Sequence, residues 1–222
     1  HHPNEIAQNQ AFCGCGGLSE ATNSGAKIWM HNNFLVERSG KMSKSAGEFL
    51  RLQLLIDKGY HPLAYRMMCL QAHYRSELEF SWEGLQAALT RLKRIVMAVR
   101  KWEERLPNTE IPGDSWEYDR VTRDRVERFN VAISSDLNTA EALTVLEEVL
   151  SAKKVAPECV FTAIGRMDMV LGLNLETLRR EDLRIRPKDA QINEEEIADA
   201  LERRKAARAE KDFATSDAIQ IG

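Results

Sequence analysis

A short loop spanning residues 40–47 carries the residues best suited to chemistry. Its centre reads Lys41-Met42-Ser43-Lys44-Ser45. Two ammonium groups on flexible stems suit a triphosphate, and the small serines let the backbone approach the phosphates. A loop that closes onto a departing pyrophosphate would stabilise the transition state more than the bound substrate. The residues alone leave a second interpretation open, a solvated surface loop.

A second candidate site lies at the start of the chain. His1 and Glu5 are four residues apart, so on a helix they share one face. An imidazole and a carboxylate form half of a tetrahedral zinc site. The alternative is a pair of surface helix residues. Cys13 and Cys15 form a close pair without a second pair elsewhere, which favours a flexible loop over a metal site, although they are conceivable substitute zinc ligands.

The bulk composition narrows the class of protein. The 222 residues include 31 Lys and Arg against 34 Asp and Glu, a net charge of -3. A nucleic acid would therefore have to meet a local basic face. No apolar run reaches the length of a membrane span, and the four scattered cysteines indicate a reducing compartment. These features predict a cytoplasmic protein without membrane contact.

Periodicity and turn residues predict the elements that position these sites. We expect a helix over 4–12, a glycine-rich loop over 13–25 and a buried strand or hairpin over 27–37. Further helices are predicted over 50–58, 62–74, 81–106, 118–134, 139–153, 156–171, 193–210 and 213–219. Ser81 and Asn138 are predicted to cap two of them, and residues 136–139 are predicted to be a helix-entry turn and not a contact. The four helices between 81 and 171 are expected to form an antiparallel bundle, and the charged segment 178–189, with Pro187, is expected to be a linker.

Basic residues on two predicted helices are candidates for phosphate contacts. They are Arg91, Lys93, Arg94, Arg100, Lys101, Arg203, Arg204, Lys205, Arg208 and Lys211. From charge alone we favour an ordinary solvated face, because glutamates such as Glu103 and Glu202 balance them. Trp82 and Trp102 fit the apolar stripe of the long helix and are predicted to be core residues.

Several longer motifs carry a resemblance to a known family. They are His1-His2-Pro3-Asn4-Glu5-Ile6-Ala7-Gln8, Trp29-Met30-His31-Asn32, the lysine pentapeptide, His73-Tyr74-Arg75-Ser76 and Asp136-Leu137-Asn138-Thr139. The pentapeptide resembles the signature of class I aminoacyl-tRNA synthetases, and the motifs in this order resemble the cysteinyl enzymes. Departures from that pattern are Pro3, Asn33, Ala46 and Glu48.

The resemblance implies a mainly α chain from the C-terminal portion of such an enzyme. Residues 1–48 would be the remnant of a Rossmann-like catalytic domain and 49–80 a stem-contact segment. Residues 81–177 would form a helical tRNA-binding bundle, followed by a linker over 178–190 and the start of a small domain over 191–222.

The resemblance also implies a chemistry. The full-length enzyme would use ATP with Mg²⁺ to attach cysteine to its tRNA through a cysteinyl-adenylate. Lys44 would contact the nucleotide, Lys41 would be its companion, and residues 41–45 would form the ATP-binding loop. His1 and Glu5 would hold zinc together with two cysteines upstream of residue 1. Zinc prefers a thiolate to a hydroxyl, which would exclude serine.

We expect weak or no zinc binding and no adenylate formation by the 222-residue chain alone, because the upstream nucleotide signature is missing. Two other functions remain open at this point. One is the related ligase that joins cysteine to an amino sugar in mycothiol synthesis, and the other is a stand-alone helical tRNA-binding module.

Overall fold

The computed structural model describes residues 2–13, 28–37, 40–41, 51–189 and 194–221. Over these ranges the chain is mainly α-helical with one small three-stranded sheet, which confirms the predicted mainly α class. The helices outside the central bundle are α1 (His2–Cys13), α2 (Leu52–Asp57), α3 (Pro62–Leu70), α8 (Glu194–Ala209) and α9 (Phe213–Ile221). None of the described helices is long and apolar enough to cross a membrane.

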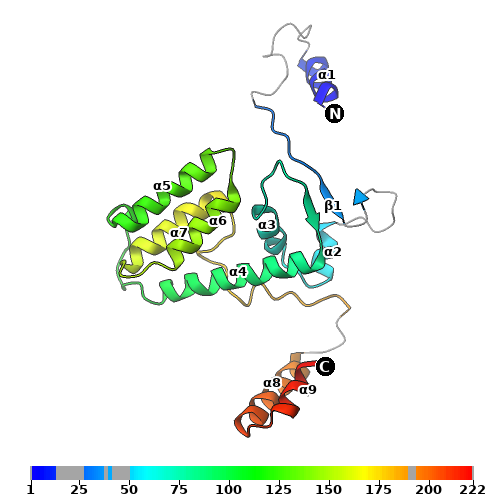
Figure 1. Cartoon of the computed structure of the whole chain (residues 1–222), viewed down its shortest axis with the longest axis vertical. Coiled ribbons are helices and arrows are strands. Elements are labelled where there is room, and N and C mark those ends of the chain that lie inside the picture. The colour runs from blue at the N-terminus through cyan, green and yellow to red at the C-terminus, as the bar shows by residue number, and fades with distance from the viewer. Residues whose placement is uncertain (1, 14–27, 38–39, 42–50, 190–193, 222) are drawn as a thin grey trace.

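Four helices form the central bundle. They are α4 (Trp82–Glu103), α5 (Arg120–Ser134), α6 (Thr139–Leu150) and α7 (Pro157–Leu171), with a short 3-10 turn, η2 (Ser115–Glu117), before α5. Figure 1 shows α5, α6 and α7 lying together over one half of the longer α4. The predicted four-helix arrangement is confirmed, although α6 ends three residues before the expected Lys153.

The bundle helices begin where their sequences provide capping oxygens. The Ser81 hydroxyl accepts from the backbone N–H of Gly84 at the start of α4. At the start of α6, Asn138 accepts from the backbone N–H of Glu141. These contacts satisfy donors that have no partner within the helix, as expected from the sequence.

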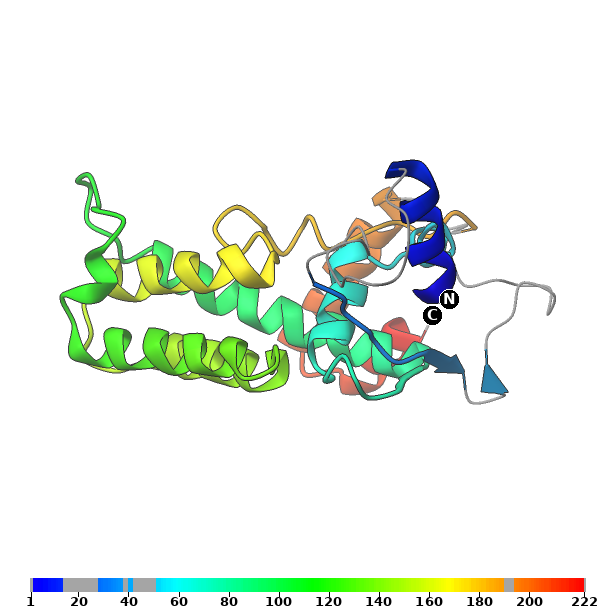
Figure 2. The same cartoon turned by 90° about the horizontal axis from the view of Figure 1, so that it is seen from above.

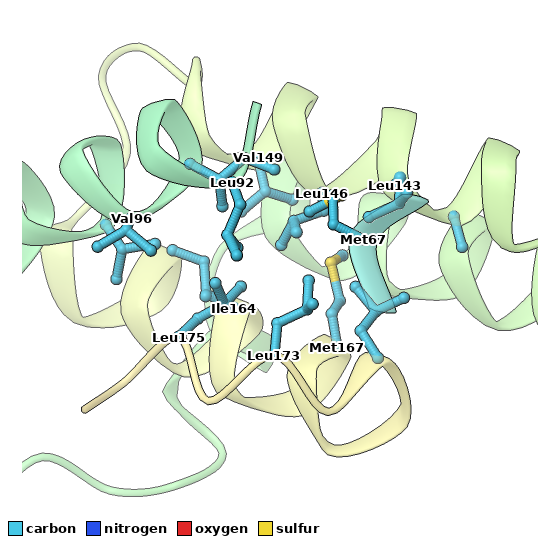
Figure 3. Packing of buried hydrophobic residues seen from close by; sticks show 14 of the residues in the cluster. Met67, Leu92, Val96, Leu143, Leu146, Val149, Ile164, Met167, Leu173 and Leu175 are labelled. Atoms are coloured by element: carbon cyan, nitrogen blue, oxygen red, sulfur yellow. The ribbon is translucent and has the colours of Figure 1, made fainter. Parts of the chain in front are cut away.

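Apolar residues at helical spacing fill the interior. Leu92 and Val96 of α4 face Leu146 of α6 and Ile164 of α7 (Figure 3), and all four side chains are buried. Trp102 is 5% exposed, and its indole N–H donates to the carbonyl of Leu150 at 2.9 Å. The predicted core role of Trp102 is therefore confirmed.

The sheet joins chain segments on either side of α2 and α3. Strand β1 (Leu35–Glu37) pairs antiparallel with β2 (Gly40–Lys41) and parallel with β3 (Leu78–Phe80), so β1 is the central strand. The prediction of a buried strand over 27–37 is wrong for its first part. Ile28 is 85% exposed and Met30 54%, because pairing begins only at Leu35.

The segment after α7 packs along the bundle. Asp168, nearly buried in α7, accepts from the backbone N–H groups of Leu173 and Leu175 at 2.8 and 2.7 Å. Burial raises the pKa of this carboxyl, and the two N–H donors oppose the shift. Leu183 is also buried. The charged segment after residue 177 is therefore anchored by buried leucines at 178 and 183, while most of its other side chains are exposed.

A glycine and an arginine join α3 to the end of α7. The Nε–H group of Arg66 donates to the carbonyl of Leu171 at 2.5 Å. Gly172 ends the helix in the left-handed region at φ +61°, and a Cβ there would lie 2.9 Å from an Arg66 guanidinium nitrogen. Only glycine accommodates both the backbone conformation and the close guanidinium.

Helices α8 and α9 pack against each other as a separate hairpin. Figure 1 shows this hairpin beyond the end of the long segment that leaves the bundle, and in Figure 2, seen from above, the two helices overlap other elements. The turn between the two helices places Lys211 at φ +62°. The Asp212 carboxylate then accepts from the backbone N–H and the hydroxyl of Thr215, which caps the start of α9.

Candidate functional site

The lysine loop begins where strand β2 ends. Lys41 is the last residue of β2, and its backbone pairs with Val36 of β1. Met42, Ser43, Lys44 and Ser45 lie outside the described residues. The structure therefore places the entry to the predicted phosphate-binding loop, while the role of its side chains stays a prediction.

Strand β1 connects this entry to the helical bundle. Val36 pairs with Lys41 on one side and with Glu79 of β3 on the other. Strand β3 leads directly into α4, whose first residue, Trp82, packs edge-on against Phe80 at a ring-centroid distance of 5.2 Å. A single strand thus joins the loop entry to the start of the longest bundle helix.

Two motifs that carried the family resemblance meet in space. The turn after α3 contains Tyr74 and Arg75, and the turn between α5 and α6 contains Asp136. Asp136 accepts from the Tyr74 hydroxyl at 2.5 Å and from Arg75 Nη2 at 3.2 Å, and it forms an ion pair with Arg75 Nε at 2.8 Å. The His73 Nε2 atom lies 3.7 Å from the same carboxylate. Residues about 60 positions apart therefore form one polar cluster.

The cluster has the electrostatics of a charge-assisted contact. The Tyr74 hydroxyl holds the pKa of Asp136 below its ordinary value, and Arg75 and His73 add to the effect. The same carboxylate raises the pKa of Arg75. The Arg75 guanidinium also lies over the Tyr74 ring at 5.3 Å. The carboxylate form of Asp136 is therefore the one that the cluster favours.

The turn that carries Asp136 is strained. Asp136 and Leu137 both have left-handed backbones, with φ of +56° and +55°. Such conformations cost roughly 1 to 3 kcal/mol each outside glycine, so they persist only where surrounding contacts hold them. The sequence predicted residues 136–139 as a helix-entry device. That role belongs to Asn138, and the contact made by Asp136 was missed.

Asn33 extends the cluster to the strand that precedes the loop. Its amide Nδ2 donates to the carbonyl of Arg75 at 3.1 Å, and its backbone N–H donates to the carbonyl of Tyr74 at 2.9 Å. Its Oδ1 accepts from the N–H of Phe34 at 2.8 Å. The residues just before β1 are therefore tied to the turn that Asp136 holds.

Several of the predicted phosphate contacts are satisfied within the protein. Arg91 forms a two-point contact with Glu147, at 2.9 and 3.1 Å, and also donates to Gln71. Arg100 pairs with Glu103 and donates to a backbone carbonyl. These two half-buried arginines are therefore paired with glutamates inside the protein and do not form the ordinary solvated face predicted for them.

A second group of cations is arranged differently. Lys93 on α4 is half-buried, and burial lowers its pKa, with Arg180 and Arg184 adding repulsion. Both arginines are exposed and lie on the segment after α7. Within the described ranges none of the three forms an ion pair. Convergent cations without a partner carboxylate suit an external anion.

The predicted zinc ligands are only partly placed. Glu5 lies exposed on α1, while His1 and Cys15 fall outside the described residues. Among the side chains that the structure describes, no three of the His, Cys, Asp and Glu type come together as a metal site. The described residues thus offer one isolated carboxylate, which does not make a zinc site by itself.

Residues 1–90 match the family model described as "tRNA synthetases class I (C) catalytic domain". Across 221 residues, 99% of the chain, the sequence is 67% identical to a cysteine–tRNA ligase of Novosphingobium aromaticivorans. It is 47% identical to the corresponding enzyme of Zymomonas mobilis and 34% identical to that of Thermus thermophilus, in each case over 99% of the chain.

The chain spans less than half the length of these curated relatives, 44%, 47% and 44% respectively. A Zea mays relative, 32% identical over 99% of the chain, is named as chloroplastic/mitochondrial. The matches therefore concern one portion of each of these relatives.

Proposed function

Because the chain corresponds to a portion of the class I cysteine–tRNA ligases, we propose that the full-length protein attaches cysteine to its tRNA at the expense of ATP. The structural observation that supports this most directly is strand β1. One edge of β1 pairs with the strand that ends at Lys41, and the other edge pairs with the strand that leads into the bundle. A nucleotide loop and an RNA-binding unit would share one rigid connection.

The reaction has two steps. The carboxylate of cysteine attacks the α-phosphorus of ATP, forms a mixed anhydride and releases pyrophosphate. A hydroxyl of the terminal ribose of tRNA then attacks the carbonyl carbon, forms the ester and releases AMP. Negative charge grows on the pyrophosphate during the first step, so cations placed there stabilise the transition state selectively.

Lys41 and Lys44 are the residues to which we assign this role. The antiparallel pairing of Lys41 with Val36 fixes the backbone at the start of the loop. Lys44, three residues further on, would reach the nucleotide, with Met42, Ser43 and Ser45 completing the loop. Mg²⁺ would enter with ATP as part of the substrate.

The bundle would bind the tRNA. Lys93, Arg180 and Arg184 are candidates to meet its phosphates, since none of the three forms an ion pair within the described ranges. In this proposal residues 1–48 belong to the catalytic domain, 49–80 to the stem-contact segment and 81–177 to the tRNA-binding bundle. Residues 178–190 lead to a small domain that begins with α8.

Zinc is proposed only for the full-length protein. There it would bind the substrate thiolate, with His1 and Glu5 as two of its ligands. The isolated position of Glu5 on α1 supplies no further support, so no step of the reaction is assigned to the metal here.

Cysteine-dependent exchange between ATP and pyrophosphate, measured on the full-length protein, tests the first step. Lys44→Ala should slow exchange at least about tenfold, equivalent to ~1.4 kcal/mol, with little change in KM for cysteine. Lys153→Ala is the matched control, because Lys153 is an exposed lysine just after α6. An unchanged rate for Lys44→Ala removes the proposed role of the loop. Charging of tRNA rather than an amino sugar tests the second step.

A further inference from the structure

We propose that Asp136 is a positioning residue which, through Arg75 and Asn33, holds strand β1 and the entry to the lysine loop in place relative to the helical bundle. This inference rests on the proposed function, since it assigns the cluster a role in adenylate formation. Asp136 itself touches neither substrate in this scheme. It acts at a distance, through the strand that it orients.

The first step of the argument is that Asp136 serves the neighbouring turn and not its own helices. Its carboxylate accepts from Tyr74 and Arg75, and both lie on the turn that follows α3. Capping of α6 is performed by Asn138. A capping role for Asp136 is therefore unnecessary, yet its backbone is kept in the left-handed region. The carboxylate links two separate parts of the fold.

The second step leads from that turn to the strand. Asn33 donates from its side chain to the Arg75 carbonyl and from its backbone to the Tyr74 carbonyl. Strand β1 begins two residues later, at Leu35. Asn33 therefore binds the turn through two hydrogen bonds and fixes the start of β1 relative to it.

The third step leads from β1 to the loop. Val36, three residues after Asn33, pairs with Lys41. The contacts thus run from Asp136 through Arg75, Asn33 and Val36 to the first lysine of the pentapeptide. The links are hydrogen bonds, an ion pair, the short chain from Asn33 to Val36 and a strand pairing, so a displacement at one end is passed to the other.

The bundle contains a second ion pair that can serve as a control, because it is not connected to β1 through Asn33. Glu148 of α6 accepts from Arg128 of α5 at 2.6 and 3.3 Å. This contact joins α5 to α6 through a partly exposed carboxylate, which also lies 3.8 Å from Arg125, and among the described residues it does not reach Asn33 or β1. Glu148→Gln removes an ion pair of the same kind without touching the proposed connection.

The experiment uses the full-length protein and two readouts. Amide hydrogen exchange of residues 35–37 and 40–41 reports whether β1 is held, and cysteine-dependent ATP–pyrophosphate exchange reports adenylate formation. Asp136→Ala and Asn33→Ala should each accelerate amide exchange in the strands at least about fivefold. Each should lower kcat at least about fivefold while KM for cysteine stays within about twofold.

The double variant distinguishes a shared path from two separate defects. Because Asp136 and Asn33 act through the same turn, the pair should lower kcat by little more than the stronger single change, instead of by the product of the two. Asp136→Asn keeps an acceptor for Tyr74 and should restore part of the activity. Glu148→Gln should leave both readouts near wild type.

The inference would be overturned if amide hydrogen exchange in β1 and β2, and kcat, both stayed at wild-type values in Asn33→Ala and Asp136→Ala. Equal losses in Glu148→Gln would overturn it too, since they would reveal a general loss of stability. Should Asp136→Ala not fold, Asn33→Ala decides alone. Absence of exchange activity in the wild type would instead refute the proposed function, and the amide readout would still decide whether Asp136 holds β1.

Discussion

Replacing Gly172 by alanine should destabilise the bundle by an amount that depends on Arg66. Gly172 ends α7 at φ +61°, where an L residue costs ~1 to 2 kcal/mol. The added Cβ would lie 2.9 Å from a guanidinium nitrogen of Arg66 and 3.3 Å from its Cζ and Nε. Arg66 can retreat only by giving up its 2.5 Å contact with the Leu171 carbonyl.

A hydrogen bond from a charged donor contributes roughly 1.5 to 3 kcal/mol net. Gly172→Ala should therefore lower the free energy of unfolding by more than the ~1 to 2 kcal/mol of the backbone alone, and by at most about 5 kcal/mol because the exposed Arg66 can move into water. In an Arg66→Ala background the clash is absent, so the same change should cost only ~1 to 2 kcal/mol. Urea unfolding followed by helical circular dichroism measures all four corners of this double-mutant cycle.

Gly113→Ala is the control, because a Cβ at Gly113 would meet nothing within 4 Å. Its unfolding free energy should stay close to that of the wild type. The reasoning is refuted if Gly172→Ala costs the same in both Arg66 backgrounds. A cost below about 1 kcal/mol in the wild-type background would also contradict it, since even the backbone conformation would then carry no penalty.

Two further outcomes follow from titrating groups. Burial, with a smaller effect from Cys69, raises the pKa of Tyr65 to about 12. Burial of neutral Tyr65 therefore stabilises the folded state fully below pH 10.0, and this contribution should be lost as the pH rises from 10.0 to about 12. In an ultraviolet titration, Tyr65→Phe should show one tyrosine fewer ionising near pH 12 than the wild type does. The pKa of Asp136 is lowered from 3.8, so its contribution is present above that pH and should disappear as pH falls below it. The urea concentration at the unfolding midpoint should fall with decreasing pH in the wild type and fall less in Asp136→Asn. An equal dependence of the midpoint on pH in both proteins would contradict the assigned contact.

The helical part of the fold was predictable because its signal is local. Leu85, Leu92 and Val99 recur at helical spacing and are all buried in α4. Ser81 and Asn138 marked helix starts that the structure confirms. Such patterns depend only on residues within a few turns of one another, so the sequence contains them directly.

The sheet and the polar cluster depend on distant residues and were not predictable in the same way. The apolar run near Ile28 and Met30 looked buried, but those side chains are exposed because strand pairing starts later. The contact between Arg75 and Asp136 joins positions 61 apart. Its only sequence signal was that both residues lie in motifs of the family resemblance, which does not say that the motifs touch.

For the loop residues 41–45, the sequence predicted the chemistry but could not predict the geometry. The spacing of Lys41 and Lys44 indicated a phosphate site, and the structure adds that Lys41 closes a strand. Met42 to Ser45 lie outside the described residues, so the assignment of the second lysine rests on the sequence and its resemblance.

The parallel pairing of β1 with β3 also has a consequence for the order of folding. Leu35 can pair with Leu78 only after the intervening chain, which includes α2 and α3, has closed into a loop. Closing a loop of this size costs conformational entropy that local helix contacts do not cost, so pairing between strands distant in sequence tends to form late. The pairing of β1 with β3, which attaches the strands next to Lys41 to the rest of the fold, should therefore be among the last contacts to form and among the first to open. A nucleotide that engages the loop would then stabilise the segment whose closure is slowest.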